Sequence, residues 1–460
     1  MLLKEKHKKF NKSRRRHILI ITNHGCHSPI IKVTTDTGGQ NFYVNDLCKA
    51  LLKLGYKVTI LNRGGYKHPT TGVLHKGVVY YDDVWKRNGI YCRIVYLEDG
   101  INKFIPKEQL TYDNLQKEKR FFFKIVKKIN IDLRNIYFIS SHYWDAGVLG
   151  IFIDDELKKK LGFSLPHIWT PHSLGILKKK NYKNAPEDVV KALNFPFRIK
   201  NEKKIISTVD GVVSTSSKIH RTLTKYGSKI KNHFWFPPGV DVKLFKPRKL
   251  RRCKNGIKVL KDALKLKRNQ LINLITNKVL FLEVSRTAKS KQKDLVLKSF
   301  SRIKSKDSAL LAMTVDKEPG LYEEILELYK RLKNRENIVI LDRFLTKEEI
   351  SEIFSLADVY VTASLMEGWG MAVQEAAASK CAIISSKFVP FVTEVLKDNA
   401  FIVNKNSPRL YAEKMDILIE EPNLRKRLAS KCYKIVKKHY SWDALTTKLI
   451  KKMKRRKIIK

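Results

Sequence analysis

The sequence predicts an α/β protein made of two doubly wound parallel-sheet domains that face each other across a cleft. Its 460 residues are too many for one compact core, so two domains of roughly 200 residues each are expected. Short apolar runs typical of buried strands alternate with helical patterns through both halves of the chain. Pro237, Pro238 and Gly239, followed by the basic segment 246–268, interrupt this alternation once. We therefore expect a basic N-terminal tail (1–16), domains at 17–245 and 246–440, and a closing helix (441–460).

The first half reads as a regular series of strands and helices. Gly55 ends the first long helical pattern as a C′ residue, where glycine takes the left-handed conformation without strain. The expected strands are 17–22, 57–61, 91–97, 136–140, 166–170, 211–215 and 233–236, and the expected long helices are 41–54 and 113–128.

The second half repeats the alternation. Thr346 and Glu349 form a capping-box pattern at the start of a helix expected over 346–357. The expected strands are 279–285, 309–315, 337–341, 359–365, 381–386 and 400–403, with a helix around 376–380 and further helices over 408–459. Such an alternation favours a parallel sheet covered by helices in each half.

Composition limits the classes of protein that fit. The formal charge is +49, which attracts nucleic acid, anionic lipid and phosphorylated substrates alike. Lysines are spread over the whole chain, so a general compositional bias explains the charge more simply than a dedicated nucleic-acid surface. The basic ends at 4–16 and 448–460 are the segments expected to touch anionic membranes. No apolar run reaches the roughly 20 residues of a membrane span. Six scattered cysteines without a Cys-x-x-Cys pair indicate reduced thiols and a cytoplasmic location.

Two glutamates lie eight residues apart in a glycine-containing turn between a strand and a helix. Glu367 falls in the turn and Glu375 about one turn into the helix. The carboxyl end of a parallel strand is where open α/β sheets bind ligands, and helix N-termini offer free N–H groups there. The N–H groups of Gly370 and Met371 would point at the same ligand. A solvated pair of carboxylates is the alternative.

Two further patterns, the second and third, follow other strand ends. Gly38 and Gly39, just before Gln40, would let the backbone approach a phosphate at a helix start, although an ordinary flexible loop has the same composition. Arg286 and Lys291 follow the first strand of the second half and could neutralise a diphosphate, a role that Lys289 or Lys293 could share.

The fourth pattern is His142, which follows the strand at 136–140. A lone histidine is more often structural than catalytic, but Asp145 and Gly147 accompany this one.

These motifs together resemble the retaining glycosyltransferases of family 4, which have the GT-B fold of two Rossmann-like domains. The two glutamates resemble that family's E-x7-E element, and Arg286 with Lys291 resembles its Arg-x4-Lys clamp. The run Asp36-Thr-Gly-Gly-Gln40, the motif around His142 and the His-Ser-Leu-Gly of 172–175 resemble segments of sucrose synthases and sucrose-phosphate synthases. The resemblance spans roughly residues 17 to 450, and it implies that the C-terminal helix returns to the first domain.

The resemblance also implies roles for these residues. Glu375 would bind the ribose of a nucleotide sugar, Glu367 and His142 would contact the transferred hexose, and Arg286 with Lys291 would stabilise the leaving diphosphate without an obligatory metal or other cofactor.

The implied donor is UDP-glucose and the implied acceptor is fructose 6-phosphate, with Lys103 and Arg198 as candidates to hold the acceptor phosphate. Two other functions remain open: a transferase acting on a lipid or polysaccharide at a membrane surface, and a basic nucleic-acid-binding protein. Against the latter, no known nucleic-acid module is visible and no specific nucleic acid is expected as a partner.

Overall fold

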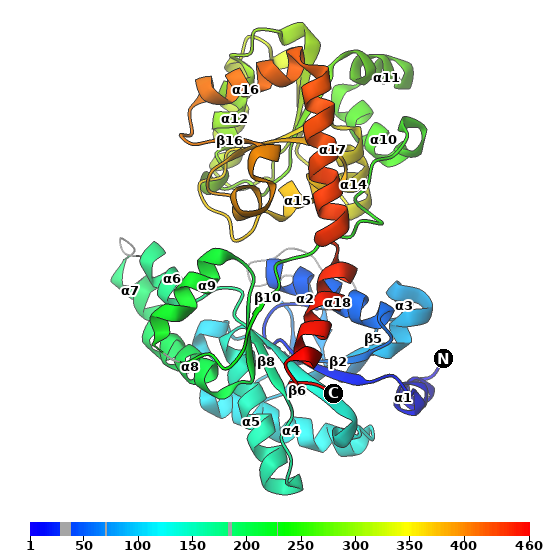
Figure 1. Cartoon of the computed structure of the whole chain (residues 1–460), viewed down its shortest axis with the longest axis vertical. Helices are drawn as coiled ribbons and strands as arrows, with labels where there is room; N and C mark the ends of the chain where they lie inside the picture. Colours follow the sequence, from blue (N-terminus) through cyan, green and yellow to red (C-terminus); the bar gives the residue numbers. More distant parts are fainter. Residues whose placement is uncertain (28–37, 70, 183–185, 228) are drawn as a thin grey trace. The chain divides into compact units, whose positions relative to one another are not determined.

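The computed structural model describes residues 1–27, 38–69, 71–182, 186–227 and 229–460. The chain forms two compact units. Unit 1 comprises residues 1–237 and 442–460, and unit 2 comprises residues 238–441. The units divide at 237/238, whereas the sequence placed the change of domain at 245/246. In each unit a twisted sheet is covered by helices on both faces (Figure 1).

Unit 1 is built on a sheet in which eight described strands run in the order β10-β9-β8-β7-β1-β2-β6-β5. All neighbours in this order are parallel except β5 and β6. The strands are β1 (His17–Ile21), β2 (Lys57–Gly64), β5 (Val78–Tyr80), β6 (Cys92–Glu98), β7 (Ile136–His142), β8 (His167–Thr170), β9 (Gly211–Ser214) and β10 (His233–Trp235). A separate antiparallel pair, β3 (Tyr66–Lys67) with β4 (Leu74–His75), is too short for a sequence pattern to reveal.

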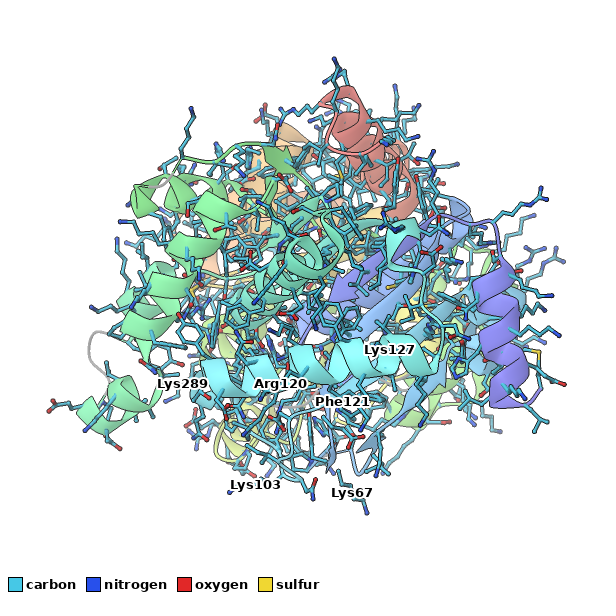
Figure 2. All side chains as sticks on the ribbon, turned by 90° about the horizontal axis from the view of Figure 1, so that it is seen from below. Lys67, Lys103, Arg120, Phe121, Lys127 and Lys289 are labelled. Carbon is cyan, nitrogen blue, oxygen red and sulfur yellow. The ribbon has the colours of Figure 1, made fainter. Side chains whose placement is uncertain are left out.

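The helices of unit 1 cover both faces of this sheet. They are α1 (Leu3–Lys12), α2 (Gly39–Lys53), α3 (Asp82–Trp85), α4 (Tyr112–Lys128), α5 (Trp144–Leu161), α6 (Gly175–Asn181), α7 (Glu187–Ala192), α8 (Phe195–Thr208), α9 (Ser217–Leu223) and α18 (Trp442–Arg455). On α4, Arg120 and Lys127 are exposed while Phe121 packs partly against the core (Figure 2). The segment inferred to be a basic tail contains the helix α1.

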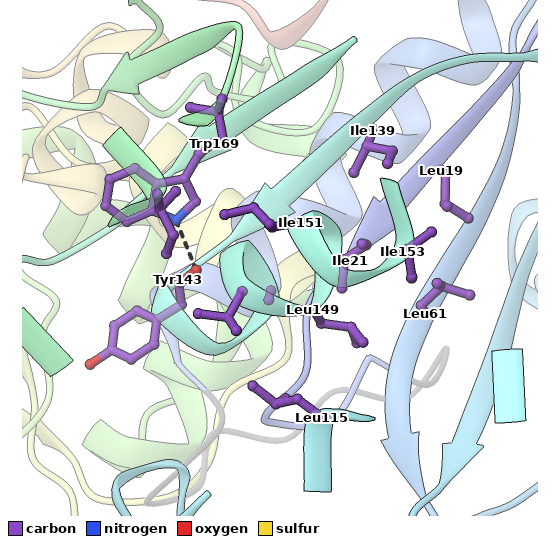
Figure 3. Close-up of a cluster of buried hydrophobic side chains, with 14 of the residues drawn as sticks. Leu19, Ile21, Leu61, Leu115, Ile139, Tyr143, Leu149, Ile151, Ile153 and Trp169 are labelled. Carbon is purple, nitrogen blue, oxygen red and sulfur yellow. Dashed lines mark hydrogen bonds between the residues drawn. The ribbon is translucent and has the colours of Figure 1, made fainter. Parts of the chain in front are cut away.

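One core cluster of unit 1 lies between the sheet and helix α5. Leu19 and Ile21 of β1 pack with Leu149 and Ile153 of α5 (Figure 3). The buried indole of Trp169 donates a hydrogen bond to the backbone oxygen of Tyr143 at 2.8 Å. Burial of apolar side chains on this scale is what fixes the sheet beneath the loops that follow its strands.

Unit 2 repeats the plan with a six-stranded parallel sheet in the order β13-β12-β11-β14-β15-β16. Its strands are β11 (Val279–Glu283), β12 (Ala309–Thr314), β13 (Ile338–Leu341), β14 (Val359–Thr362), β15 (Ala382–Ser386) and β16 (Phe401–Val403). Its helices are α10 (Lys254–Leu264), α11 (Arg268–Asn277), α12 (Lys293–Phe300), α13 (Leu321–Arg331), α14 (Lys347–Leu356), α15 (Met371–Ala378), α16 (Pro408–Glu420) and α17 (Pro422–His439). Both hydrogen bonds of the expected capping box form between Thr346 and Glu349 at the start of α14.

Each sheet has a topological switch point, where successive connections leave in opposite directions. In unit 2 the chain runs from β11 outward through β12 to β13 and then returns to place β14 on the other side of β11. In unit 1, β1 lies between β2 and β7 in the same way. Open α/β sheets bind ligands at such points, beyond the carboxyl ends of the strands.

The fold class predicted from the sequence is confirmed. The expected strands match observed ones, with ends that differ by a few residues because the pattern of apolar residues does not mark where pairing stops. The C-terminal helix α18 belongs to unit 1, as expected, and Trp442 at its start packs edge-on against Tyr43 of α2. Within the described part of the chain, none of the helices has the length and apolar character needed to span a membrane.

Candidate active site

In unit 2, the two loops at the switch point bring together two of the residues predicted from the sequence. Lys291 lies in the loop after β11, and its ammonium donates a hydrogen bond to the carboxylate of Glu367 in the loop after β14. Glu367 also accepts a hydrogen bond from the hydroxyl of Ser364 at 3.2 Å. Both side chains remain partly exposed, at 13% for Lys291 and 23% for Glu367, so the pair is open to a ligand.

The loop that carries Lys291 is held by its neighbours on both sides. Thr287 and Asp316, from the loops after β11 and β12, each donate a backbone N–H to the other's side chain, at 2.9 and 2.7 Å. On the other side, the N–H of Leu365 donates to the backbone oxygen of Ser290 at 2.7 Å. These bonds fix the position of Lys291 relative to Glu367 before any ligand arrives.

Lys293, which follows Lys291 by two residues, makes its contacts in the interior of unit 2. It is buried and pairs with the carboxylate of Glu283 at the end of β11, and it donates to the backbone oxygen of Thr314 at 2.7 Å. The expectation that Lys293 could share the role of Lys291 is therefore not favoured by this geometry. Arg286 and Lys289 are exposed. The backbone oxygen of Arg286 accepts from the Ser285 hydroxyl at 3.3 Å, but its guanidinium has no hydrogen bond or ion pair with a described residue and is available to an anion.

The turn after Glu367 requires a glycine. Gly370 has φ = +106°, and a Cβ there would lie 2.4 Å from Cγ1 of Val389. Helix α15 then begins at Met371 and places Glu375 one turn in. The pKa of the Tyr360 hydroxyl is raised first by burial and then by the charges of Glu283, Glu367 and Glu375, which act on the same hydroxyl.

In unit 1, His142 ends β7 at the corresponding switch point. It is fully buried, with Nε2 3.1 Å from the Ser140 hydroxyl and Nδ1 2.9 Å from Nε2 of His172. Burial, followed by the proximity of His172, holds the pKa of His142 well below its usual value. His142 is therefore neutral near pH 7 and can act as a hydrogen-bond donor or acceptor rather than as a cation. His172, the first residue of the His-Ser-Leu-Gly segment, is its direct partner.

Two further histidines join this cluster that sequence patterns did not single out. Nδ1 of His24 lies 3.1 Å from the carboxylate of Asp145, which is buried in the first turn of α5. Nε2 of His27 lies 2.9 Å from the hydroxyl of Thr22, and burial, followed by the charge of His24, lowers the pKa of His27 to about 3. The signal that could have found them is their place directly after β1, the strand next to β7.

Gln40 bridges the two strand ends at this switch point. Its side-chain amide donates to the hydroxyl of Thr22 at 3.1 Å and to the backbone oxygen of His142 at 3.4 Å. Gly38 is the N-cap of helix α2 and Gly39 its first residue, and a Cβ at either would meet no described atom within 4 Å. Gly39 is exposed, whereas Asp36 lies outside the described residues.

The two residues expected to bind an acceptor phosphate differ in their surroundings. Arg198 is buried and donates from Nε to Glu202 at 2.8 Å and from Nη2 to the backbone oxygen of Ser173 at 2.8 Å. It also bonds the hydroxyl of Tyr143. Lys103 is exposed (Figure 2), and its backbone oxygen accepts from the buried guanidinium of Arg63 at 3.2 Å. None of the described contacts joins Lys103 to Arg198.

A group of cations near Arg198 was missed from the sequence. Lys107 and Lys178 approach the same carboxylate of Glu108, at 3.3 and 3.8 Å. Burial, followed by the charges of Lys107 and Arg198, lowers the pKa of Lys178 to about 8. Lys178 comes three residues after Gly175 of the His-Ser-Leu-Gly motif, which is the sequence signal that could have drawn attention to it.

Metal ligands are a separate question. In the portions of the chain that the structure describes, no three His, Cys, Asp or Glu side chains are placed to hold a metal ion. Independence of a metal remains a prediction.

Comparison with known proteins gives a consistent result for both units. Residues 37–244 match the family model described as Glycosyltransferase Family 4, and residues 262–435 match that of Glycosyl transferases group 1. The mannosylfructose-phosphate synthase of Agrobacterium fabrum is 31% identical over 377 residues, which cover 79% of this chain and 74% of that protein.

Solved structures agree with these matches. The sucrose-phosphate synthase of Thermosynechococcus elongatus superposes with a TM-score of 0.70 at 22% identity, covering 96% of this chain and 99% of that one. Anabaena HepE, solved in complex with UDP-glucose, gives a TM-score of 0.62 at 13% identity, covering 95% and 99%. The fold is that of the GT-B enzymes. Within that class, the chain belongs to the family 4 glycosyltransferases, as the motifs in the sequence predicted.

Proposed function

We propose that this glycosyltransferase moves a hexose from a nucleotide sugar, UDP-glucose, to the hydroxyl of a sugar phosphate, fructose 6-phosphate, with retention of configuration at the anomeric carbon. The observation that carries the proposal is the contact between Lys291 and Glu367 at the switch point of unit 2. A cation beside a carboxylate can meet both parts of a nucleotide sugar, the diphosphate and the hexose hydroxyls.

The donor side of the proposal assigns one task to each residue. Lys291 and the exposed Arg286 would stabilise the negative charge that grows on the leaving diphosphate as the glycosidic bond breaks. Glu367 would exchange its contact with Lys291 for hydroxyls of the hexose. Glu375 would accept hydrogen bonds from the ribose, while the N–H groups of Gly370 and Met371 at the start of α15 would donate to the ligand.

Residues of unit 1 would contact the transferred hexose, the donor and the acceptor. His142, kept neutral by burial, would hydrogen-bond the transferred hexose. At the start of α2, Gly39 and Gln40 would present N–H groups to the donor, whereas the N–H of Gly38 already donates to the Asn41 side chain at 3.0 Å. Lys103 and Arg198 were expected to bind the acceptor phosphate, and in the structure Arg198 forms an ion pair with Glu202. Lys107 and Lys178 support a phosphate site because they add positive charge in the same unit.

Two comparisons support a phosphorylated fructose as the acceptor. One relative is named for mannosylfructose phosphate and one structural neighbour for sucrose phosphate, so both names describe a phosphorylated product with a fructosyl group. They differ in the hexose that is transferred, and for this reason the donor has to be tested with both glucosyl and mannosyl nucleotides.

The test is a screen of nucleoside diphosphate release by the purified protein. UDP-glucose and GDP-mannose are each combined with fructose 6-phosphate, fructose and no acceptor, and the anomeric configuration of the product is read by proton NMR. We expect release with UDP-glucose that depends on fructose 6-phosphate and an α-linked product. Equal turnover of fructose and fructose 6-phosphate would contradict a phosphate-recognising site.

The screen also separates the alternatives. Preference for GDP-mannose would correct the donor and keep the acceptor, and a β-linked product would contradict retention. The prediction of a peripheral membrane enzyme has its own measurement, sedimentation with anionic vesicles that is lost at high salt. Action in the cytoplasm stays a prediction from the sequence.

A further inference from the structure

Unit 1 contains a cavity at the edge of its sheet opposite to His142. The cavity measures about 230 Å³, several times the roughly 30 Å³ that one water molecule occupies in the liquid. His17 and Lys57, which line it, are the first residues of the parallel strands β1 and β2, and Arg93 is the second residue of β6. The candidate active-site residues of unit 1 lie at the carboxyl ends of the strands, so this cavity is a different place.

The lining of the cavity is strongly cationic. Arg14, Arg15 and Arg16 contribute to it together with Lys57 and Arg93, whereas Asp132 is the one carboxylate among its described lining residues. Burial, followed by the charge of Arg93, lowers the pKa of Lys57, and Asp132 opposes this only in part. Positive charges held this close repel one another, and an anion among them would relieve that repulsion.

Arg93 supplies a donor that the protein itself leaves unused. Its side chain is fully buried, with Nε bonded to the hydroxyl of Thr59 at 3.1 Å and Nη1 to the hydroxyl of Tyr80 at 3.2 Å. The guanidinium lies 3.9 Å from the ring centre of Phe10. Nη2 is buried and has no hydrogen-bond partner among the described residues. A buried, charged donor without a partner is costly, which points to a ligand that supplies the acceptor.

The neighbouring cations contribute charge in different ways. The ammonium of Lys57 donates to the backbone oxygens of Phe10 and Ser13, both at 3.1 Å, and so closes the end of α1. Arg15 donates to the backbone oxygen of Leu52 at 2.9 Å. Arg14 is exposed, and its guanidinium has no hydrogen bond or ion pair with a described residue, so it can reach a ligand at the rim.

We propose that this cavity binds a phosphate group, either as inorganic phosphate or as the phosphate of a small metabolite, at a site distinct from the one that performs sugar transfer. A phosphate carries up to two negative charges and several acceptor oxygens, which match the unpartnered Nη2 of Arg93 and the free guanidinium of Arg14. Because Phe10 and Lys57 also hold α1 against the sheet, the ligand stabilises the docked form of that helix.

The experiment measures inorganic phosphate binding by calorimetry and by the melting temperature, at constant ionic strength with chloride as the replaced anion. The background variant is Lys178→Met, which removes a cation from the proposed acceptor side so that binding there does not mask the cavity. In this background we compare Arg14→Glu and Arg93→Lys with Arg120→Glu, which changes an exposed arginine on α4 by the same charge. Circular dichroism verifies that each variant is folded.

We expect phosphate to raise the melting temperature and its affinity to fall at least tenfold in Arg14→Glu and in Arg93→Lys, with Arg120→Glu unchanged. An equal loss in Arg120→Glu would mean that only the overall charge matters and would overturn the proposal. The proposal would also be overturned if phosphate did not bind to Lys178→Met, or if neither Arg14→Glu nor Arg93→Lys weakened its binding. Repeating the titration with a hexose phosphate and the unphosphorylated hexose shows which source the site prefers, since only a phosphate-bearing ligand should compete with inorganic phosphate.

Discussion

Lys291 and Glu367 form an ion pair although 76 positions separate them in the chain. They meet because β11 and β14 are hydrogen-bonded neighbours at the switch point of the second sheet. Without a ligand, each side chain satisfies the other. A nucleotide sugar would have to separate them, with the diphosphate replacing Glu367 at the ammonium and the hexose hydroxyls replacing Lys291 at the carboxylate.

The first prediction concerns Lys291. Replacing it with alanine should lower kcat on the order of 100-fold, because a charge that stabilises the leaving diphosphate in the transition state is lost. Steady-state rates of nucleoside diphosphate release measure the effect. Lys333→Ala is the control, since Lys333 is an exposed lysine of the same unit that lies outside the loops carrying the candidate site. Similar rates for the two variants would remove Lys291 from the reaction.

The second prediction concerns Glu375. Glu375→Ala should abolish detectable binding of the nucleotide sugar while the fold stays intact, because the proposed acceptor of the ribose hydroxyls disappears. Titration calorimetry with UDP-glucose measures binding, and Glu420→Ala, an exposed position at the end of α16, is the control. Unchanged affinity in Glu375→Ala would exclude this glutamate from the site.

The third prediction is a pH dependence of acceptor binding. The pKa of Lys178 is lowered to about 8, so the lysine is charged below that pH and neutral above it. An anionic acceptor favours the charged form. KM for fructose 6-phosphate should therefore rise as the pH passes through about 8, and KM for the nucleotide sugar should rise less.

The variant Lys178→Met gives the control for that profile. It should show a higher KM for fructose 6-phosphate at pH 7 and no step near pH 8, while the exposed Lys179→Met should behave as the wild type. A step of the same size in Lys178→Met would assign the titration to another group.

The fourth prediction is a loss of stability in acid. Burial lowers the pKa of His27 and His167 to about 3, against about 6.5 in the unfolded chain. The unfolded state then binds more protons, so their contribution to stability is complete above pH 6.5 and is lost as the pH falls from 6.5 towards 3. The slope is at most about 1.4 kcal/mol per pH unit for each histidine.

Urea unfolding at pH 7 and pH 5 measures this slope. The variant His167→Gln should lose stability at pH 7, because the hydrogen bond between the ring and the Ser141 hydroxyl is altered, but its stability should depend less on pH than that of the wild type. An unchanged pH dependence would show that His167 is not among the groups responsible.

Much of the donor side could be predicted from the sequence because its motifs follow strand ends. Glu367, Glu375 and Gly370 lie where a strand, a tight turn and a helix succeed one another, and local patterns report that order. The choice among Lys289, Lys291 and Lys293 could not be made in this way. It depends on Glu283 at the end of β11, which engages Lys293 in the interior.

The acceptor side was less accessible to sequence reasoning. Arg198 lies four residues before Glu202, one turn of α8, and the two side chains form a buried pair that spacing alone does not distinguish from an exposed one. His24 and Lys178 gain their significance from neighbours on other strands and helices. Such contacts join segments far apart in the chain, and no local pattern encodes them.

The sequence by itself determined the alternation of strands and helices, the division into two similar halves and the chemical groups at the strand ends, because hydrophobic periodicity and turn residues act over a few positions. Only the tertiary structure decided which of those groups touch. The order of strands in each sheet sets which loops are adjacent, and burial sets which charges are neutralised within the protein and which remain for a ligand.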